Sequence, residues 1–148
     1  MKTKILLIIC LFQNVFAFGQ MIRTIAGNGV AGYTGDGGMA IAAELHQPMG
    51  IVFDTSGNLF MAQVIDNCIR KISSSGVITT IAGTTVAGYG GDGGAATAAL
   101  LNYPWGLAID PGGNLYVAEQ SNHRIRKIDH AGIITLSLIH ISEPTRPY

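Results

Sequence analysis

The chain has 148 residues, of which 48% are hydrophobic and 12% are charged, and its formal net charge is zero. Its 20 glycines fall at turns rather than at every third position, so the composition is typical of a globular protein and excludes a disordered or collagen-like one. Residues 20–135 carry six Lys or Arg against eight Asp or Glu, a net charge of −2, which leaves no basic surplus for phosphate contacts and predicts no nucleic-acid partner.

Residues 1–19 are predicted to be a secretory signal peptide. Two lysines near the start precede a short apolar run, and the small residues Ala17 and Gly19 predict cleavage before Gln20. The apolar run is too short to span a bilayer, so we expect a secreted or periplasmic protein with no membrane span after cleavage. The mature chain keeps one cysteine, Cys68, which we expect at a variable surface position.

The rest of the chain is organised by a repeat. Residues 24–79 recur as residues 80–135 without a gap, an offset of 56, and about thirty of the positions are identical. Both copies begin Thr-Ile-Ala-Gly and continue with Gly-Asp-Gly-Gly, Pro-x-Gly, Asp-x-x-Gly-Asn-Leu and Ile-Arg-Lys-Ile. A fixed period of this length indicates a repeat architecture.

Each copy is predicted to contain the same elements in the same order. In the first copy, Met21–Gly27 is expected to be a strand, residues 27–38 a glycine-rich loop, and Met39–Leu45 a short helical turn capped by Asp36. Four strands separated by turn residues then predict an antiparallel meander, and the continuously apolar first strand is expected to be the most deeply buried. The strands are expected at residues 50–54, 58–63, 68–73 and 77–82, and again at 106–110, 114–119, 124–129 and from 133 onward.

One meander cannot cover both of its faces, whereas radial stacking of similar units can. The sequence therefore predicts an all-β fold: two four-stranded antiparallel blades of an incomplete β-propeller, with short helical turns in the loops between blades. A linear solenoid, the rival repeat fold, uses shorter turns or a single strand in each repeat.

The motifs of residues 104–129 resemble the NHL repeat. The second copy has the fullest match, with Asn122-His123-Arg124 before Ile-Arg-Lys-Ile, whereas the first copy has Asp66-Asn67-Cys68 there. The two copies also differ at Gln63 and Glu119, where the family commonly has Asp. The long loops resemble a subclass found in secreted bacterial proteins. The resemblance covers residues 21–135 and implies a propeller that is commonly six-bladed, of which this chain supplies about two blades.

Residues 136–148 break the repeat in the middle of a strand. The first copy continues with Thr-Ile-Ala-Gly at this point, but the second continues with Leu-Ser-Leu-Ile-His-Ile. This tail resembles the translation of a sequencing adapter, so we expect it not to belong to the protein and expect no site residue within it.

No catalytic residue, cofactor or metal site is predicted. Asp36 and Asp92 each give a loop one carboxylate, far short of the six to eight oxygens that calcium requires, and we expect them to cap the short helix or to accept hydrogen bonds from backbone amides within their own loop. The spacing of Gly27, Gly29 and Gly32 matches a dinucleotide-binding pattern by letter, but no long helix is predicted after it. The histidines His46, His123 and His130 fall at different places in the repeat.

The best candidate for a binding face is the set of loops that join the blades. Loops of this kind gather on one face of a propeller, and aromatic residues there often mark recognition surfaces. Arg70, Lys71, Arg126 and Lys127 are expected to be framework residues, solvated or paired with carboxylates of a neighbouring blade. The candidate binding residues are Tyr33, Asp36, Tyr89, Asp92, Tyr103 and Trp105.

These expectations favour a non-catalytic binding scaffold for a protein, peptide or glycan. The alternative is the N-terminal part of a propeller enzyme, a lyase or hydrolase, whose active site lies in blades outside this sequence. A third class is an adhesin or cell-wall module attached to further domains. The sequence leaves these alternatives open, because one fold hosts many functions.

Overall fold

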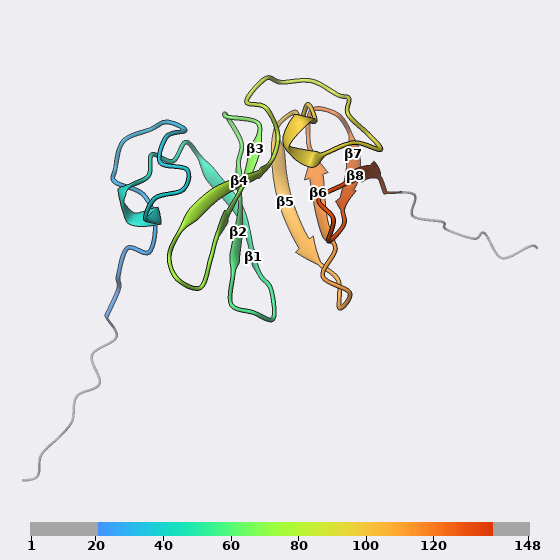
Figure 1. Cartoon of the computed structure of the whole chain (residues 1–148). Coiled ribbons are helices and arrows are strands. Elements are labelled where there is room, and N and C mark those ends of the chain that lie inside the picture. Colours follow the sequence, from blue (N-terminus) through green and yellow to red (C-terminus); the bar gives the residue numbers. More distant parts are fainter. Residues whose placement is uncertain (1–20, 138–148) are drawn as a thin grey trace, which may run out of the picture.

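A computed structural model describes residues 21–137 and shows two four-stranded sheets that lie side by side, joined by a long loop that arches over one end (Figure 1). The predicted signal peptide lies outside the described residues, as does the predicted tail from residue 138 onward. Both sheets are antiparallel and have their strands in sequence order. The first blade contains β1 (Pro48–Phe53), β2 (Leu59–Gln63), β3 (Cys68–Ile72) and β4 (Ile78–Ala82), and the second contains β5 (Pro104–Ile109), β6 (Leu115–Glu119), β7 (Arg124–Ile128) and β8 (Ile134–Leu136).

The first hairpin of each blade is closed by the Asp-x-x-Gly-Asn motif. The Asp54 carboxylate accepts hydrogen bonds from the backbone of Ser56 (2.9 Å) and Asn58 (2.8 Å) and from the Asn58 side chain (2.7 Å). Asp110 accepts equivalent bonds from the backbone and side chain of Asn114 (2.9 and 2.8 Å). These bonds hold the pKa of both aspartates below the usual 3.8, because they stabilise the ionised form. The motif therefore fixes the turn locally, as its sequence predicts.

Short helical turns occupy the two long loops, as predicted. They are the 3-10 turns η1 (Ala40–Ala42) and η2 (Ala96–Ala98). Neither turn has a side-chain cap at its start, so the predicted capping role of Asp36 is wrong. The backbone explains this: the residue before η1 is Met39, three positions beyond Asp36.

Two other sequence predictions about strands fail. Met21–Gly27 is irregular and joins neither sheet. Its repeat equivalent, β4, is hydrogen-bonded to β3, but the described residues contain no strand before β1 with which Met21–Gly27 could pair. The first strand is not the most buried, since Ile51 and Phe53 are each 58% exposed. β1 packs against the second blade on one side only, whereas β2 and β3 contribute residues to the hydrophobic clusters on both sides of their sheet.

β8 includes one residue of the stretch predicted to be a tail. Leu136 pairs with Arg126 across the sheet, as Thr80 pairs with Arg70 in the first blade, and the amide of Ser137 donates to the carbonyl of Ile125 (2.9 Å). β8 is three residues long, whereas the equivalent β4 has five.

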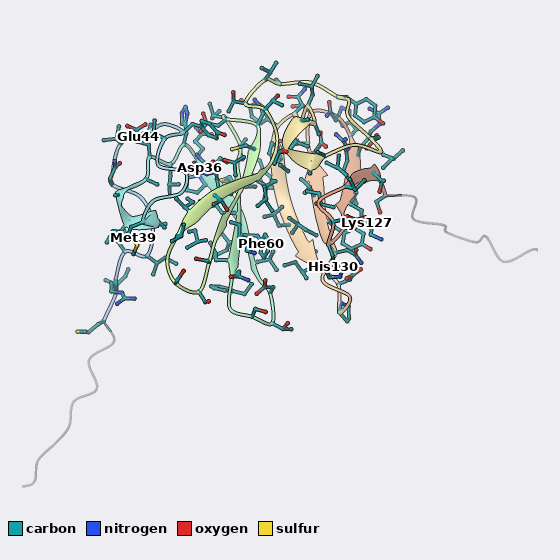
Figure 2. The ribbon with its side chains drawn as sticks, in the orientation of Figure 1. Asp36, Met39, Glu44, Phe60, Lys127 and His130 are labelled. Carbon is teal, nitrogen blue, oxygen red and sulfur yellow. The ribbon has the colours of Figure 1, made fainter. Side chains whose placement is uncertain are left out.

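The hydrophobic core has two parts. The larger cluster lies between the blades, where Phe60 is seen in Figure 2, and β5 packs against both β1 and β2. The smaller cluster lies on the outer side of the first blade, between its sheet and η1. The residues of the larger cluster are Ala62, Ile69, Ala82, Ala96, Ala99, Leu101, Leu115, Val117, Ile128 and Ile134.

Candidate functional site

The two glycine-rich loops fold back onto the 3-10 turns that follow them. Gly91 has φ +87°, and a Cβ added there would lie 2.8 Å from the Cα of Ala99, so glycine is needed both for the conformation and for the close approach. Gly35 makes the same approach to Ala43 in the first loop. The repeated glycines therefore give the two loops one shape, which presents one aspartate to each blade.

Asp36 connects its loop to the first sheet. Its carboxylate forms an ion pair with Arg70 on β3 (2.7 Å) and accepts a hydrogen bond from the backbone of Thr80 on β4 (3.0 Å). Figure 2 shows Asp36 where this loop meets the sheet. The Arg70 side chain is fully buried, whereas that of Asp36 is 42% exposed. Asp36 therefore ties the loop to two strands and does not bind within its own loop.

Arg126 organises the equivalent region of the second blade. It is fully buried and binds Asp92 through both Nε (2.9 Å) and Nη2 (2.8 Å). It also donates to the carbonyls of Leu100 (3.0 Å) and Gly90 (3.1 Å), and it approaches Glu119 on β6 at 3.4 Å. The arginine thus holds the loop against the sheet through two carboxylates and two carbonyl groups.

Glu119 is a buried carboxylate within this network. Its side chain is fully buried, and it accepts hydrogen bonds from Asn122 and from the backbone of Asn102 (3.2 Å). Burial raises the pKa of Glu119 above its usual value. The Asn122 hydrogen bond and the Arg126 charge act in the opposite direction and offset part of this increase. Arg126 is therefore the positive charge that, together with the Asn122 hydrogen bond, opposes the effect of burial on Glu119.

The first blade builds the same network with its carboxylate moved. Gln63 takes the place of Glu119 and accepts a hydrogen bond from Arg70 (2.8 Å), while Asp66 takes the place of Asn122 and accepts from Gln63 (2.9 Å). Each blade therefore pairs one carboxylate with one amide at these two positions. Arg70 is less completely bonded than Arg126, since its buried Nε has no hydrogen-bond partner among the described residues.

The tyrosines of the two loops lie against the same arginines. Tyr33 is half-buried, its hydroxyl bonds to that of Thr80 (3.1 Å), and its ring lies 5.2 Å from the Arg70 guanidinium. Tyr89 is 43% exposed, donates to Asp92 (2.8 Å), and carries Arg124 at 4.0 Å from its ring centre. The hydrogen bond to Asp92 raises the pKa of Tyr89. Each ring is therefore in cation–π contact with an arginine of the blade that follows its loop.

The structure divides the six predicted binding residues. It joins Tyr33 with Asp36 through Arg70 in the first blade, and Tyr89 with Asp92 through Arg126 in the second. Tyr103 lies where the blades meet, and its amide donates to the Asn67 side chain (2.9 Å). Trp105 lines a pocket of about 550 Å³ on the open side of the second blade.

Two predictions about single residues are wrong. Cys68 is fully buried rather than on the surface, and burial raises its pKa to about 12. Arg70 and Arg126 are buried rather than solvated, and each pairs with the loop preceding its own blade rather than with a neighbouring blade. Sequence reasoning also missed the roles of Glu119 and Asn122. The signal was the paired exchange with Gln63 and Asp66, which only a structure identifies as one hydrogen-bonded set.

Residues 21–137 contain neither a metal-binding cluster nor a helix that could span a membrane. They contain no group of three or more His, Cys, Asp or Glu side chains that could hold a metal ion. None of the helices described there is long and apolar enough to cross a membrane. His46 lies 3.5 Å from Asp66, an approach that counts as an ion pair only when the histidine is protonated.

Family models match both copies of the repeat. The NHL repeat model matches residues 101–128, and the teneurin NHL domain model matches residues 29–90. SUPPRESSOR OF QUENCHING 1 of Arabidopsis thaliana is 32% identical over 139 residues, which are 90% of this chain and 12% of that protein. Mouse teneurin-1 is 33% identical over 121 residues, covering 72% of this chain and 4% of the relative. The chain therefore spans a small part of each relative.

Solved structures show the same fold. A Bacteroides thetaiotaomicron protein of unknown function has a TM-score of 0.57 at 27% identity, over 67% of this chain and 24% of the other. An auxiliary nutrient binding protein of the same organism has a TM-score of 0.56 at 22% identity, over 76% and 28%. The two sheets described above are thus blades of a β-propeller.

Proposed function

Because this chain belongs to the NHL-repeat family, we propose that it is a secreted or periplasmic binding scaffold, without catalytic activity of its own, for a protein, peptide or glycan. The observation that carries the proposal is the exposed Tyr89, which bonds to Asp92 and contacts Arg124 on a loop that a buried arginine anchors.

Rigid aromatic side chains on anchored loops suit recognition. A tyrosine gives a large contact area at a low cost in conformational entropy, and less entropy is lost when the ring is already fixed. Tyr89 is fixed from two sides, by Asp92 at its hydroxyl and by Arg124 on its ring. Sugar rings and peptide side chains both stack on such surfaces, which fits the proposed class of ligand.

The acidic groups near this face already have structural partners. Asp36 and Asp92 bind the buried arginines, and Glu119 is buried beside Arg126. An acid–base catalyst must reach its substrate, and these carboxylates are instead committed to holding the loops. This arrangement supports a scaffold role for the two blades.

The proposal is tested by screening the purified full chain on glycan and peptide arrays and measuring the affinity of the hits by calorimetry. We expect Tyr89→Ala to weaken binding by at least about tenfold, since exposed aromatic anchors dominate such interfaces. The matched control is Tyr116→Ala, whose hydroxyl bonds to Asp110 at the β5–β6 turn, at the opposite end of the blade from the Tyr89 loop. Equal losses in both variants, or no ligand on either array, would count against the proposal. Turnover of a bound ligand would favour the enzymatic alternative.

A further inference from the structure

The two blades enclose a pocket of about 270 Å³ near their hairpin turns, at the opposite end of the sheets from the Tyr89 loop (Figure 1). Its walls come from both described blades, so it is a feature of the contact between them. Phe60 of the first blade and His130 of the second line it, and both are labelled in Figure 2. Since a water takes about 30 Å³, the pocket holds roughly nine waters, or one molecule of amino-acid size.

The apolar part of the lining also comes from both blades. Phe60 and Ile81 belong to the first blade, and Leu115 and Ile128 belong to the second. The last two are members of the larger hydrophobic cluster, and the first two pack against it. An apolar group of a ligand would be removed from water against these side chains, which favours its binding.

Lys71 gives the pocket a positive charge. The residue is half-buried on β3, and its Nζ lies 5.6 Å from the centre of the Phe60 ring. Within residues 21–137, no carboxylate forms an ion pair with it. A half-buried ammonium group of this kind can bind a carboxylate group of a ligand through a charge-assisted hydrogen bond.

The first blade lacks a hydroxyl group that the second blade has at the equivalent position. Tyr116 donates to Oδ2 of Asp110 (3.1 Å), but Phe60 stands in its place beside Asp54. Among the described residues, Oδ2 of Asp54 therefore accepts one hydrogen bond, from Asn58 (2.7 Å), whereas Oδ2 of Asp110 accepts two. The acceptor that a tyrosine satisfies in the second blade is left to a donor from outside the chain in the first.

Asp129 brings a further carboxylate oxygen to the pocket from the second blade. Its Oδ1 accepts hydrogen bonds from the backbone of Ala131 and Ile133, each at 2.9 Å, whereas no donor within the described residues bonds to its Oδ2. In the first copy, Ser73 closes the equivalent turn with a single hydroxyl oxygen, which accepts from Val77 (3.1 Å). The turn thus needs one acceptor atom, and the second oxygen of Asp129 is available to a ligand.

We propose that this pocket binds a small zwitterion with an apolar side chain, that is, a free apolar amino acid. Its carboxylate pairs with Lys71, its ammonium group donates to the available oxygens of Asp54 and Asp129, and its side chain packs on the apolar lining. A ligand with only one of the two charges leaves the opposite charge of the pocket without a partner, which is the basis of selectivity. The site lies apart from the Tyr89 face and does not depend on the ligand-binding role proposed for it.

Calorimetric titration of the full chain with L-leucine tests the proposal. We expect a dissociation constant between about 10 μM and 1 mM, in keeping with the small size of the ligand. Isocaproate lacks the ammonium group of leucine, and isoamylamine lacks its carboxylate. Each should bind at least about tenfold more weakly than leucine, as should glycine, which has no side chain. Absence of leucine binding at about 10 mM would overturn the proposal, as would equal binding of any of the three analogues.

Substitutions test which residues hold the ligand. Phe60→Tyr supplies the hydroxyl that Tyr116 carries, which should bond to Asp54, displace the ammonium group and weaken leucine binding at least about fivefold. Lys71→Met should weaken it at least about tenfold. Lys127→Met is the matched control, because Lys127 occupies the equivalent position of the second blade and does not line the pocket. All three variants should keep the circular dichroism spectrum of the parent chain. Unchanged affinity in Phe60→Tyr, or equal losses in the two lysine variants, would refute the assignment.

Discussion

Replacing the buried arginine of each blade by methionine should destabilise the chain unequally. Arg126→Met removes the cation that, among the described residues, pairs with the fully buried Glu119, and it leaves that carboxylate with its two amide donors. Breaking a buried ion pair from one side costs about 3–5 kcal/mol. Arg70→Met removes the cation beside neutral Gln63, and a buried neutral group left unsatisfied costs about 1–3 kcal/mol. Asp36, the carboxylate that pairs with Arg70, is exposed enough to be hydrated.

We therefore expect Arg126→Met to cost about 2 kcal/mol more than Arg70→Met. Urea unfolding followed by circular dichroism measures this as a difference of about 1 M in midpoint, given the usual dependence of stability on denaturant. The two positions are equivalent in the repeat, so each variant is the control for the other. Equal costs, or a larger cost for Arg70→Met, would refute the argument that the buried carboxylate sets the difference.

The pH dependence gives a second check on the same reasoning. The pKa of Glu119 is raised above 4.5 by burial, and loss of Arg126 removes a charge that lowers it. The native state then keeps this proton to a higher pH than the unfolded state does. The penalty of Arg126→Met should thus be small at about pH 4.5 and grow as pH rises through the native pKa. Adding Glu119→Gln should restore much of the lost stability at about pH 8, and a pH-independent penalty would contradict this account.

Three further predictions follow from single sites. Cys68, with its pKa raised to about 12, should react with a thiol reagent at least about 100-fold more slowly in the native chain than in urea, and equal rates would show that it is accessible. Gly91→Ala should destabilise by about 1–3 kcal/mol more than Gly93→Ala, since both have positive φ but only Gly91 approaches another backbone; equal urea midpoints would contradict this. The Asp110 turn contributes stability above pH 3.8 that is lost as the pH falls through the lowered pKa of Asp110. Asn114→Ala removes the main hydrogen bond that lowers this pKa and should flatten the acid end of the curve of stability against pH. An unchanged curve would refute the role of the Asp110–Asn114 bond.

Most of the fold could be predicted from the sequence because its determinants are local. The Asp-x-x-Gly-Asn turns are closed by bonds within five residues, and the alternation of strands and turns follows from the same short motifs. The gapless repetition then predicts two four-stranded sheets of the same strand order, and the structure confirms them. The failed prediction for Met21–Gly27 shows the limit, because a strand also needs a neighbour, and that neighbour is not set by the local sequence.

The candidate site was predicted only in outline. Tyr33, Asp36, Tyr89 and Asp92 were recognised as loop residues of interest, but their partners lie about 35 positions away in the chain, as Arg126 does from Asp92. No local pattern states which of several arginines a loop aspartate meets. The same limit applies to the pair Gln63 and Asp66, which stands in the first copy where Glu119 and Asn122 stand in the second. The sequence shows that the copies differ at these two positions, but only the structure shows that the two residues are hydrogen-bonded to the same arginine network.

The sequence by itself determined the repeat, the strands, the turns and the shape of the glycine-rich loops, because these depend on backbone preferences within a few residues. Only the tertiary structure decided burial and pairing. Ile69 and Ile125 occupy equivalent positions with identical neighbours Arg-Lys-Ile, yet the first is fully buried and the second is 38% exposed. The difference comes from what packs against each: the second blade covers Ile69, whereas none of residues 21–137 covers the equivalent face of the second blade.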